Sequence, residues 1–180
     1  MNARLLPRAG SRYLSTVDLE TAVAALAPRL VAYATGRTGC RSTGEDIAQD
    51  ALVALVLRWR RFGPPESPEA FAFAIAKRRA GRAVMRRALM KPLELSNPER
   101  TSMTATGPSY ERRAELQHVM RTMRRLRAAD REVLLLRAAG ELSTEEIASV
   151  MRSSVGAVKM RLHRARERLT ELLGKVSDAR

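Results

Sequence analysis

Basic residues gather in one segment near the C-terminus, the run VGAVKMRLHRARERL that begins at Val155. Arginine and lysine donate hydrogen bonds to guanine edges and to phosphate oxygens, so these residue types suit DNA recognition. On a helical wheel of about 100° per residue, an apolar stripe occupies one face. The residues opposite it or at its edges are Lys159, Met160, Arg161, His163 and Arg164. A helix with a merely solvated, charged outer face would have the same composition, so the segment alone leaves both interpretations open.

The residues before this segment indicate the element that would hold it. A capping box, STEE at 143–146, starts a helix whose buried face is formed by Ile147, Ala148 and Met151. The turn Arg152-Ser153-Ser154 leads to the basic helix, with Ser153 or Ser154 as its N-cap. These parts form a helix-turn-helix, whose second helix fits the major groove. Arg152 occupies a turn position that often requires positive φ, which costs about 1 kcal/mol for a residue other than glycine.

Two more helices complete a C-terminal module. Residues 114–126 carry apolar residues at three-and-four spacing, namely Leu116, Val119, Met120, Met123 and Leu126. Residues 131–139 form the second helix, with Asp130 as its N-cap and Gly140 just beyond its end. The basic helix contributes its own core stripe, which consists of Val155, Val158, Leu162, Ala165, Leu169 and Leu172.

A second candidate surface lies on a helix expected from Ser42 to Phe62. This helix starts with the capping box STGE, and its core stripe is Ala48, Ala51, Leu52, Leu55, Trp59 and Phe62. Its opposite face carries Asp46, Gln49, Asp50, Val53 and Leu57. Exposed apolar residues beside carboxylates, on a basic protein, indicate a protein-binding surface. The carboxylates would also be favourable simply because they lie near the positive end of the helix dipole.

Two further helices belong to this N-terminal module. Residues 19–34 form an amphipathic helix with the stripe Leu19, Val23, Leu26, Leu30 and Ala34. A helix capped by Ser67, with Pro68 at its first position, contains the run KRRAGRAVMRR. Six of the eleven residues in this run are basic and none is acidic, and five of them are candidate DNA contacts: Lys77, Arg78, Arg79, Arg82 and Arg86. Such a run is a phosphate-binding surface or a solvated one, and the absence of interleaved acids favours the first.

The overall composition limits the class of protein. The 180 residues include 33 Lys+Arg and 19 Asp+Glu, a net charge of +14, which indicates a nucleic acid or an anionic membrane surface as partner. No apolar run approaches the roughly 18–20 residues of a spanning helix, and the N-terminus lacks the apolar core of a signal peptide. Cys40 is the only cysteine, so no intrachain disulfide can form. We predict a cytoplasmic protein without metal or cofactor that is not an enzyme, since no nucleophile, metal cluster or phosphate loop accompanies the carboxylates.

Helical periodicity fails once, between Pro92 and Tyr110, where PLELSNPERTSMTATGPSY is rich in Pro, Gly, Ser and Thr. That composition is typical of a linker. We therefore predict an all-α chain of two small helical domains joined by a flexible linker. The first domain spans 16–91, the linker 92–113, and the helix-turn-helix domain 114–180. Residues 1–15 form an N-terminal tail that is either disordered or regulatory.

The C-terminal module carries a dense set of motifs: Asp130-Arg131-Glu132, Leu142-Ser143, Glu146-Ile147-Ala148, Val155-Gly156, Val158-Lys159, Arg161-Leu162 and His163-Arg164-Ala165-Arg166. With these motifs it resembles region 4 of bacterial sigma factors, particularly the extracytoplasmic-function (ECF) group. The resemblance implies that the basic helix binds the −35 promoter element. Base contacts would come from Lys159, Met160, His163 and Arg164, and phosphate contacts from Arg161 and the turn residues Ser153 and Ser154.

The stretch GEDIAQDALVALVLRWRRF is similar to the ECF region 2 helix that binds the coiled coil of the largest polymerase subunit. The resemblance implies that Asp46, Gln49 and Asp50 bind core RNA polymerase. It also implies that the following basic helix and the loop before it hold the −10 element and the melted strand. ECF members usually carry an Asn and then an Asp where this chain has Arg78 and Arg82, so their strand-opening contacts are not carried over.

These observations predict an ECF-type sigma factor that binds core RNA polymerase and promoter DNA, with an anti-sigma factor as a further expected partner. The first alternative is an autonomous helix-turn-helix regulator, which would not need the acidic helix face and would usually dimerise to span two half-sites. The second is a sigma-like protein that has lost promoter melting, supported only by Arg78 and Arg82. The third is a basic protein of the membrane surface.

Overall fold

The computed structural model describes residues 18–90 and 110–177, and within these ranges all regular secondary structure is helical. The helices are α1 (Leu19–Thr38), α2 (Arg41–Phe62), α3 (Pro68–Met90), α4 (Tyr110–Met123), α5 (Ala128–Ala138), α6 (Thr144–Met151) and α7 (Val155–Ser177). The predicted all-α class is confirmed. The residues before 18 and between 90 and 110 lie outside the described part, so the division at 15, 91 and 113 stays a prediction.

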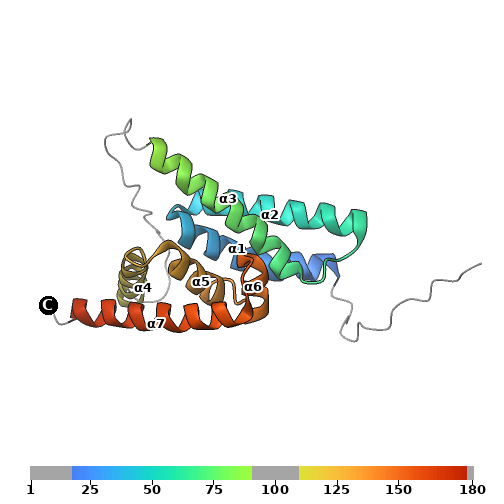
Figure 1. Ribbon diagram of the computed structural model, residues 1–180. Helices are drawn as coiled ribbons and strands as arrows, with labels where there is room; N and C mark the ends of the chain where they lie inside the picture. The colour runs from blue at the N-terminus through green and yellow to red at the C-terminus, as the bar shows by residue number, and fades with distance from the viewer. Residues whose placement is uncertain (1–17, 91–109, 178–180) are drawn as a thin grey trace, which may run out of the picture.

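The first group, α1–α3, packs around small and apolar side chains. Asp18 starts α1, because its carboxylate accepts a hydrogen bond from the Thr21 backbone N–H at 2.7 Å. α1 and α2 run antiparallel (Figure 1) and approach closely at Gly44, where any Cβ would lie 2.3 Å from Thr35 Oγ1. Ser67 caps α3 as predicted, since the Ala70 N–H donates to its hydroxyl at 3.0 Å. The closest approach of α1 and α2 thus depends on the absence of a side chain at Gly44.

The second group, α4–α7, is built around one face of α7. This helix packs along α5 and also contacts α4 and α6. Val158, Leu162 and Ala165 are buried as predicted, while Val155, Leu169 and Leu172 are half-buried. The apolar stripe thus fixes which face of α7 points to solvent.

Two N-caps differ from the prediction. α2 begins at Arg41 behind Cys40, and the capping box expected at 42–45 does not form; Glu45 pairs instead with Arg41, N to O 2.7 Å. α5 begins at Ala128, which places Asp130 in the first turn rather than at the N-cap. A carboxylate is favourable at either place, because both lie near the positive end of the helix dipole.

Other differences concern helix limits and burial. α4 is shifted toward the N-terminus relative to the expected 114–126, and Leu116 is 61% exposed rather than part of the core. Phe62, expected in the core of α2, is 65% exposed. It is the last residue of its helix, and the guanidinium groups of Arg58 and Arg61 each lie 5.1 Å from its ring centroid. Cation–π contacts thus replace burial at this position.

The two groups share one apolar core. α5 lies against α1 and α6 lies against α3, whereas α7 runs along the side of the second group that faces away from α1–α3 (Figure 1). No helix in the described residues is long and apolar enough to cross a membrane.

Candidate nucleic-acid and partner interfaces

The turn between α6 and α7 has the geometry of a helix-turn-helix. The capping box of α6 is complete: the Glu146 N–H donates to Ser143 Oγ at 3.1 Å, and the Ser143 N–H donates to Glu146 Oε2 at 2.8 Å. Arg152 ends α6 in the left-handed region, with φ 52°, as predicted. Ser154 caps α7, because its hydroxyl accepts from the Ala157 N–H at 3.2 Å. Short-range hydrogen bonds therefore fix the angle at which α7 leaves the turn.

The outward face of α7 is free of contacts with the first group. All five residues predicted to recognise the −35 element are exposed, as are the two turn serines: Lys159, Met160, Arg161, His163, Arg164, Ser153 and Ser154. His163 Nδ1 lies 3.1 Å from Glu167 Oε2, one turn along the helix. The structure thus brings this whole predicted set together on one accessible surface.

The basic run of α3 is less uniform. Arg78, Arg82 and Arg86 are exposed. Arg79 pairs with Asp50 of α2, with 2.5 Å between Nη1 and Oδ2. Lys77 is half-buried, and its ammonium lies 3.4 Å from the Val150 carbonyl oxygen of α6. Two of the five predicted −10 residues are therefore engaged by other parts of the chain.

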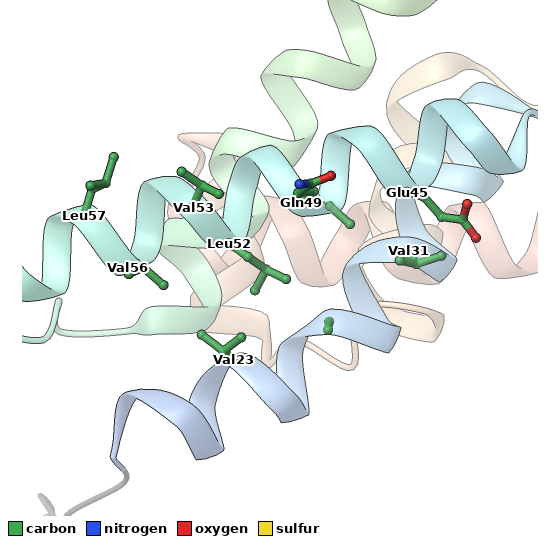
Figure 2. Close-up of a pocket in the computed structure, with 10 residues that line it drawn as sticks. Val23, Val31, Glu45, Gln49, Leu52, Val53, Val56 and Leu57 are labelled. Carbon is green, nitrogen blue, oxygen red and sulfur yellow. The ribbon is translucent and has the colours of Figure 1, made fainter.

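The predicted polymerase-binding face of α2 is exposed. Asp46 and Gln49 point to solvent, and Val53 and Leu57 are 51% and 63% exposed, which is high for large apolar residues. Beside this face, α1 and α2 form an apolar groove of about 460 Å³ whose walls include Val23, Ala27, Val31, Leu52 and Val56. Figure 2 shows Val23 facing Leu52 and Val56 across the groove, while Val53 and Leu57 point away from α1. An apolar surface with an acidic end suits a protein partner better than DNA.

A buried polar cluster between the two groups was missed by the sequence analysis. The Tyr33 hydroxyl of α1 donates to Glu132 Oε1 of α5, and Arg37 Nε of α1 lies 2.7 Å from Glu132 Oε2. Burial first, and then the charge of Glu132, raise the pKa of the Tyr33 phenol well above its ordinary value. The position of Tyr33 on the stripe that includes Leu26 and Leu30 was a usable signal, but nothing in the sequence marks Glu132 as buried.

Among the described residues, no three His, Cys, Asp or Glu side chains are grouped to hold a metal ion. Cys40 is half-buried, and hydrogen bonds from Ser42 and then Thr43 lower the pKa of its thiol. Cys40 occupies the N-cap position of α2 without a capping hydrogen bond from its thiol, and it has no ligand partners grouped for a metal ion in that part of the chain.

An all-helical chain with an exposed basic helix in a helix-turn-helix is typical of DNA-binding proteins that act in transcription. Comparison with known families agrees: Sigma-70 region 2 matches residues 22–89, and Sigma-70, region 4, matches residues 116–169. The chain belongs to the sigma-70 family of RNA polymerase sigma factors, in its ECF group. This family consists of transcription initiation factors rather than enzymes.

The curated relatives cover most of the chain. The ECF RNA polymerase sigma factor SigD of Mycobacterium tuberculosis is 33% identical over 185 aligned residues, which cover 94% of this chain and 82% of that protein. The ECF RNA polymerase sigma factor ShbA of Streptomyces griseus is 36% identical over 137 residues, which cover 71% and 70%.

Two solved structures share the fold. CnrH in complex with the cytosolic domain of CnrY aligns with a TM-score of 0.65 at 25% identity, covering 87% of this chain and 88% of that one. The sigma factor RpoE of Bartonella quintana, in complex with the anti-sigma factor NepR, aligns with a TM-score of 0.68 at 24% identity, covering 86% and 96%.

Proposed function

We propose that this chain binds core RNA polymerase and directs it to promoters by recognising a −10 and a −35 element. The observation that carries the proposal is the outward face of α7 with the turn before it, where every predicted −35 residue is exposed and Ser154 caps the helix. Such a protein works in the cytoplasm, where the chromosome and the polymerase are. The solved relatives were captured with protein partners, which supports an anti-sigma factor as a further partner.

On the −35 side, α7 enters the major groove. Lys159 and Arg164 are suited to guanine edges, and Met160 to apolar contact with a thymine methyl group. Arg161 and the turn serines bind phosphates, which positions the helix without specifying sequence. Affinity then comes mostly from phosphate contacts and falls steeply with salt.

On the −10 side, α3 supplies the cations. Arg78, Arg82 and Arg86 are free to attract the backbone of the melted region. Since Arg78 and Arg82 stand where ECF members usually have Asn and Asp, these two side chains bind through charge rather than through the family's own contacts. Lys77 and Arg79 join them once their contacts with Val150 and Asp50 are released.

Core polymerase docks on α2. Asp46, Gln49 and Asp50 provide acidic and amide groups, and Val53 and Leu57 provide apolar contact. A surface of this kind attracts a basic or amphipathic helix and repels DNA, so one face of the N-terminal group serves protein and the other serves nucleic acid.

The test is co-elution of the purified chain with bacterial core RNA polymerase on gel filtration. We expect the wild type to co-elute and the Asp46→Ala/Asp50→Ala variant to elute alone. The matched control is Glu20→Ala/Glu171→Ala, which removes the same charge from exposed positions outside the face and should co-elute. A wild-type chain that elutes alone, as a dimer that still shifts DNA, would refute the proposal in favour of an autonomous regulator.

A further inference from the structure

The two helical groups contact each other along two seams, α1 with α5 and α3 with α6. We call the arrangement in which both seams are formed the closed form. Figure 1 shows α5 and α6 lying between the first group and α7. The closed form thus covers part of α3 but leaves the outward face of α7 free.

The first seam is centred on a buried carboxylate. The side chain of Glu132 is 6% exposed and that of Arg37 is 13% exposed. Both carboxylate oxygens of Glu132 accept hydrogen bonds from the other group, one from the Tyr33 hydroxyl and one from Arg37 Nε. A tyrosine hydroxyl is protonated at neutral pH in any case, and burial raises the pKa of the Tyr33 phenol further, so this donor keeps its proton.

A buried ion pair of this kind determines which surfaces fit together, but it adds little net free energy to their association. Removing a carboxylate and a guanidinium from water costs nearly as much free energy as their attraction returns. When the groups separate, water can hydrate all three polar side chains, so the closed form opens without leaving a buried charge unpaired. When one member of the cluster is absent, however, closing buries the others without a partner, which is strongly unfavourable.

The second seam uses smaller contacts. Ser67 Oγ, at the start of α3, lies 3.0 Å from Glu146 Oε1 of α6, whereas the other small contact, from Arg29 Nε of α1 to the Gly140 carbonyl oxygen at 3.0 Å, belongs to the first seam. Lys77, one of the proposed −10 residues, points its ammonium at the Val150 carbonyl. This seam therefore occupies part of the proposed DNA surface of α3.

Distance along the DNA makes the closed form incompatible with promoter binding. Elements at −10 and −35 are separated by about 25 base pairs, or about 85 Å at 3.4 Å per pair. The Lys77 ammonium lies 3.4 Å from the Val150 carbonyl oxygen, and Lys159 follows Val150 by nine positions. Even fully extended, nine residues span only about 30 Å. The residues proposed for the two elements are thus held far too close together to contact both.

We propose that Glu132, Tyr33 and Arg37 form a latch that closes the chain on itself, and that this closed form cannot initiate transcription until the latch opens. The consequence for transcription depends on the proposed function, but the latch itself does not. It is a property of the isolated chain, with Glu132 on one group and its two donors on the other.

Energy transfer between two dyes on the full chain, without polymerase or DNA, measures the latch directly. Cys40→Ser removes the native thiol, and Arg60→Cys on α2 and Thr170→Cys on α7 supply exposed labelling sites. In this background we expect single molecules to show mainly high transfer efficiency. Glu132→Ala should raise the open-to-closed ratio on the order of a hundredfold, and Glu132→Gln about tenfold, because the amide still accepts from the Tyr33 hydroxyl.

The matched control is Arg41→Ala. It breaks an ion pair of the same 2.7 Å length as Arg37–Glu132, but within α2 and at the surface, so it should change the ratio by less than about twofold. A second variant, Gly36→Leu, opens the chain by another route. A Cβ at Gly36 would already lie 2.9 Å from Leu135 Cδ2 across the first seam, while leucine favours the helix more than glycine. It should open the chain with Glu132 intact, which shows that the dyes report separation of the two groups.

Three outcomes would overturn the latch. The first is low transfer efficiency in the labelled parent. The second is a Glu132→Ala variant that stays closed while Gly36→Leu opens, since apolar packing would then suffice. If circular dichroism shows that Glu132→Ala has lost helix, Tyr33→Phe decides in its place. It preserves the ring, should open the chain about tenfold, and would refute the latch by staying closed.

Co-elution with core polymerase, run on the same variants, separates this inference from the proposed function. If the variants open as described but the chain never binds core polymerase, the latch is supported and the proposed function is refuted. If the chain binds core polymerase but the labelled parent is already open, the proposed function is supported and the latch is refuted.

Discussion

The helices α3 and α7 are both 23 residues long and both rich in arginine, yet they offer their charge in different ways. On α7 the basic face points away from the rest of the protein, and its neighbours are solvent and the adjoining turn. On α3 the basic run is flanked by two other helices, so Arg79 pairs with Asp50 of α2 and Lys77 reaches toward α6.

The difference shows that positive charge alone does not determine whether a helix surface is available to DNA. A capped helix with a narrow apolar stripe presents its opposite face whatever the rest of the chain does. A helix packed between two neighbours presents only the charges that those neighbours leave free. We therefore regard α7 as a surface that is always available, and α3 as one whose availability depends on tertiary contacts.

Substitutions in the core should have the largest effects, because they change the stability of the groups that hold α3 and α7. Phe73 of α3 is fully buried, stacks edge to face on Tyr33 and contacts Gly140, so Phe73→Ala should cost about 3–5 kcal/mol and loosen both groups. Leu162 of α7 lies within the second group alone, and Leu162→Ala should cost about 2–4 kcal/mol. Urea unfolding followed by circular dichroism measures both.

Fluorescence of Trp59, the only tryptophan, reports on the first group separately. For Leu162→Ala we expect helix to be lost at lower urea than the Trp59 signal, whereas Phe73→Ala should move both transitions together. Coincident transitions in Leu162→Ala would show that the two groups unfold as one unit. The groups that carry α3 and α7 would then not differ in stability.

Arginine removal tests the DNA surfaces themselves. Arg164→Ala should weaken binding to a −35 duplex by about 1–3 kcal/mol and relax the preference for one base pair, because it removes a base contact. Arg82→Ala should weaken binding to all duplexes alike and lower the salt slope by about one, because it removes a phosphate contact. Fluorescence anisotropy over a salt series distinguishes the two. An Arg164→Ala variant that loses affinity equally for every duplex would mean that α7 contacts only the backbone.

The sequence predicted α7 far better than α3, and the reason is the range of the interactions involved. The capping box at Ser143, the left-handed Arg152 and the buried Val158 and Leu162 are all set by residues a few positions apart. The pairing of Arg79 with Asp50 joins residues 29 positions apart, and the contact of Tyr33 with Glu132 joins residues 99 apart. Helical periodicity gives the face on which each residue lies, but not which helix covers that face.

The same limit explains the core residues that were misassigned. Phe62 and Leu116 fit the stripes of their helices, but Phe62 is the last residue of α2, and Leu116 lies on α4, which packs mainly against α7 among the described helices. Gly44 was placed within a capping box, whereas its role is to let α1 and α2 approach each other. Such roles depend on the crossing point of two helices, which a single helix does not encode.

The turn before α7 offers a smaller, stabilising change. Arg152 adopts φ 52° and ψ 52°, a conformation that glycine adopts without the steric cost borne by other residues. Arg152→Gly should therefore stabilise the second group by up to about 1 kcal/mol, seen as a higher urea midpoint with the same slope. The matched control, Arg168→Gly at an exposed position inside α7, should destabilise by a similar amount, because there glycine interrupts a regular helix. A lower midpoint in Arg152→Gly would mean that the arginine side chain contributes more than its backbone conformation costs.

The smallest expected effect concerns the ion pair between Arg79 of α3 and Asp50 of α2. Asp50 and Arg79 are about half exposed, and exposed pairs contribute about 0–1 kcal/mol, so Asp50→Asn should change stability by less than about 0.5 kcal/mol. It should nevertheless free Arg79 for phosphate and steepen the salt dependence of duplex binding by up to about one contact. Asp46→Asn, one turn earlier on the same face, removes the same charge without releasing Arg79 and controls for net charge. Equal slopes for the two variants would show that Arg79 is already available to DNA while paired, and that α3 is as open a surface at this position as α7.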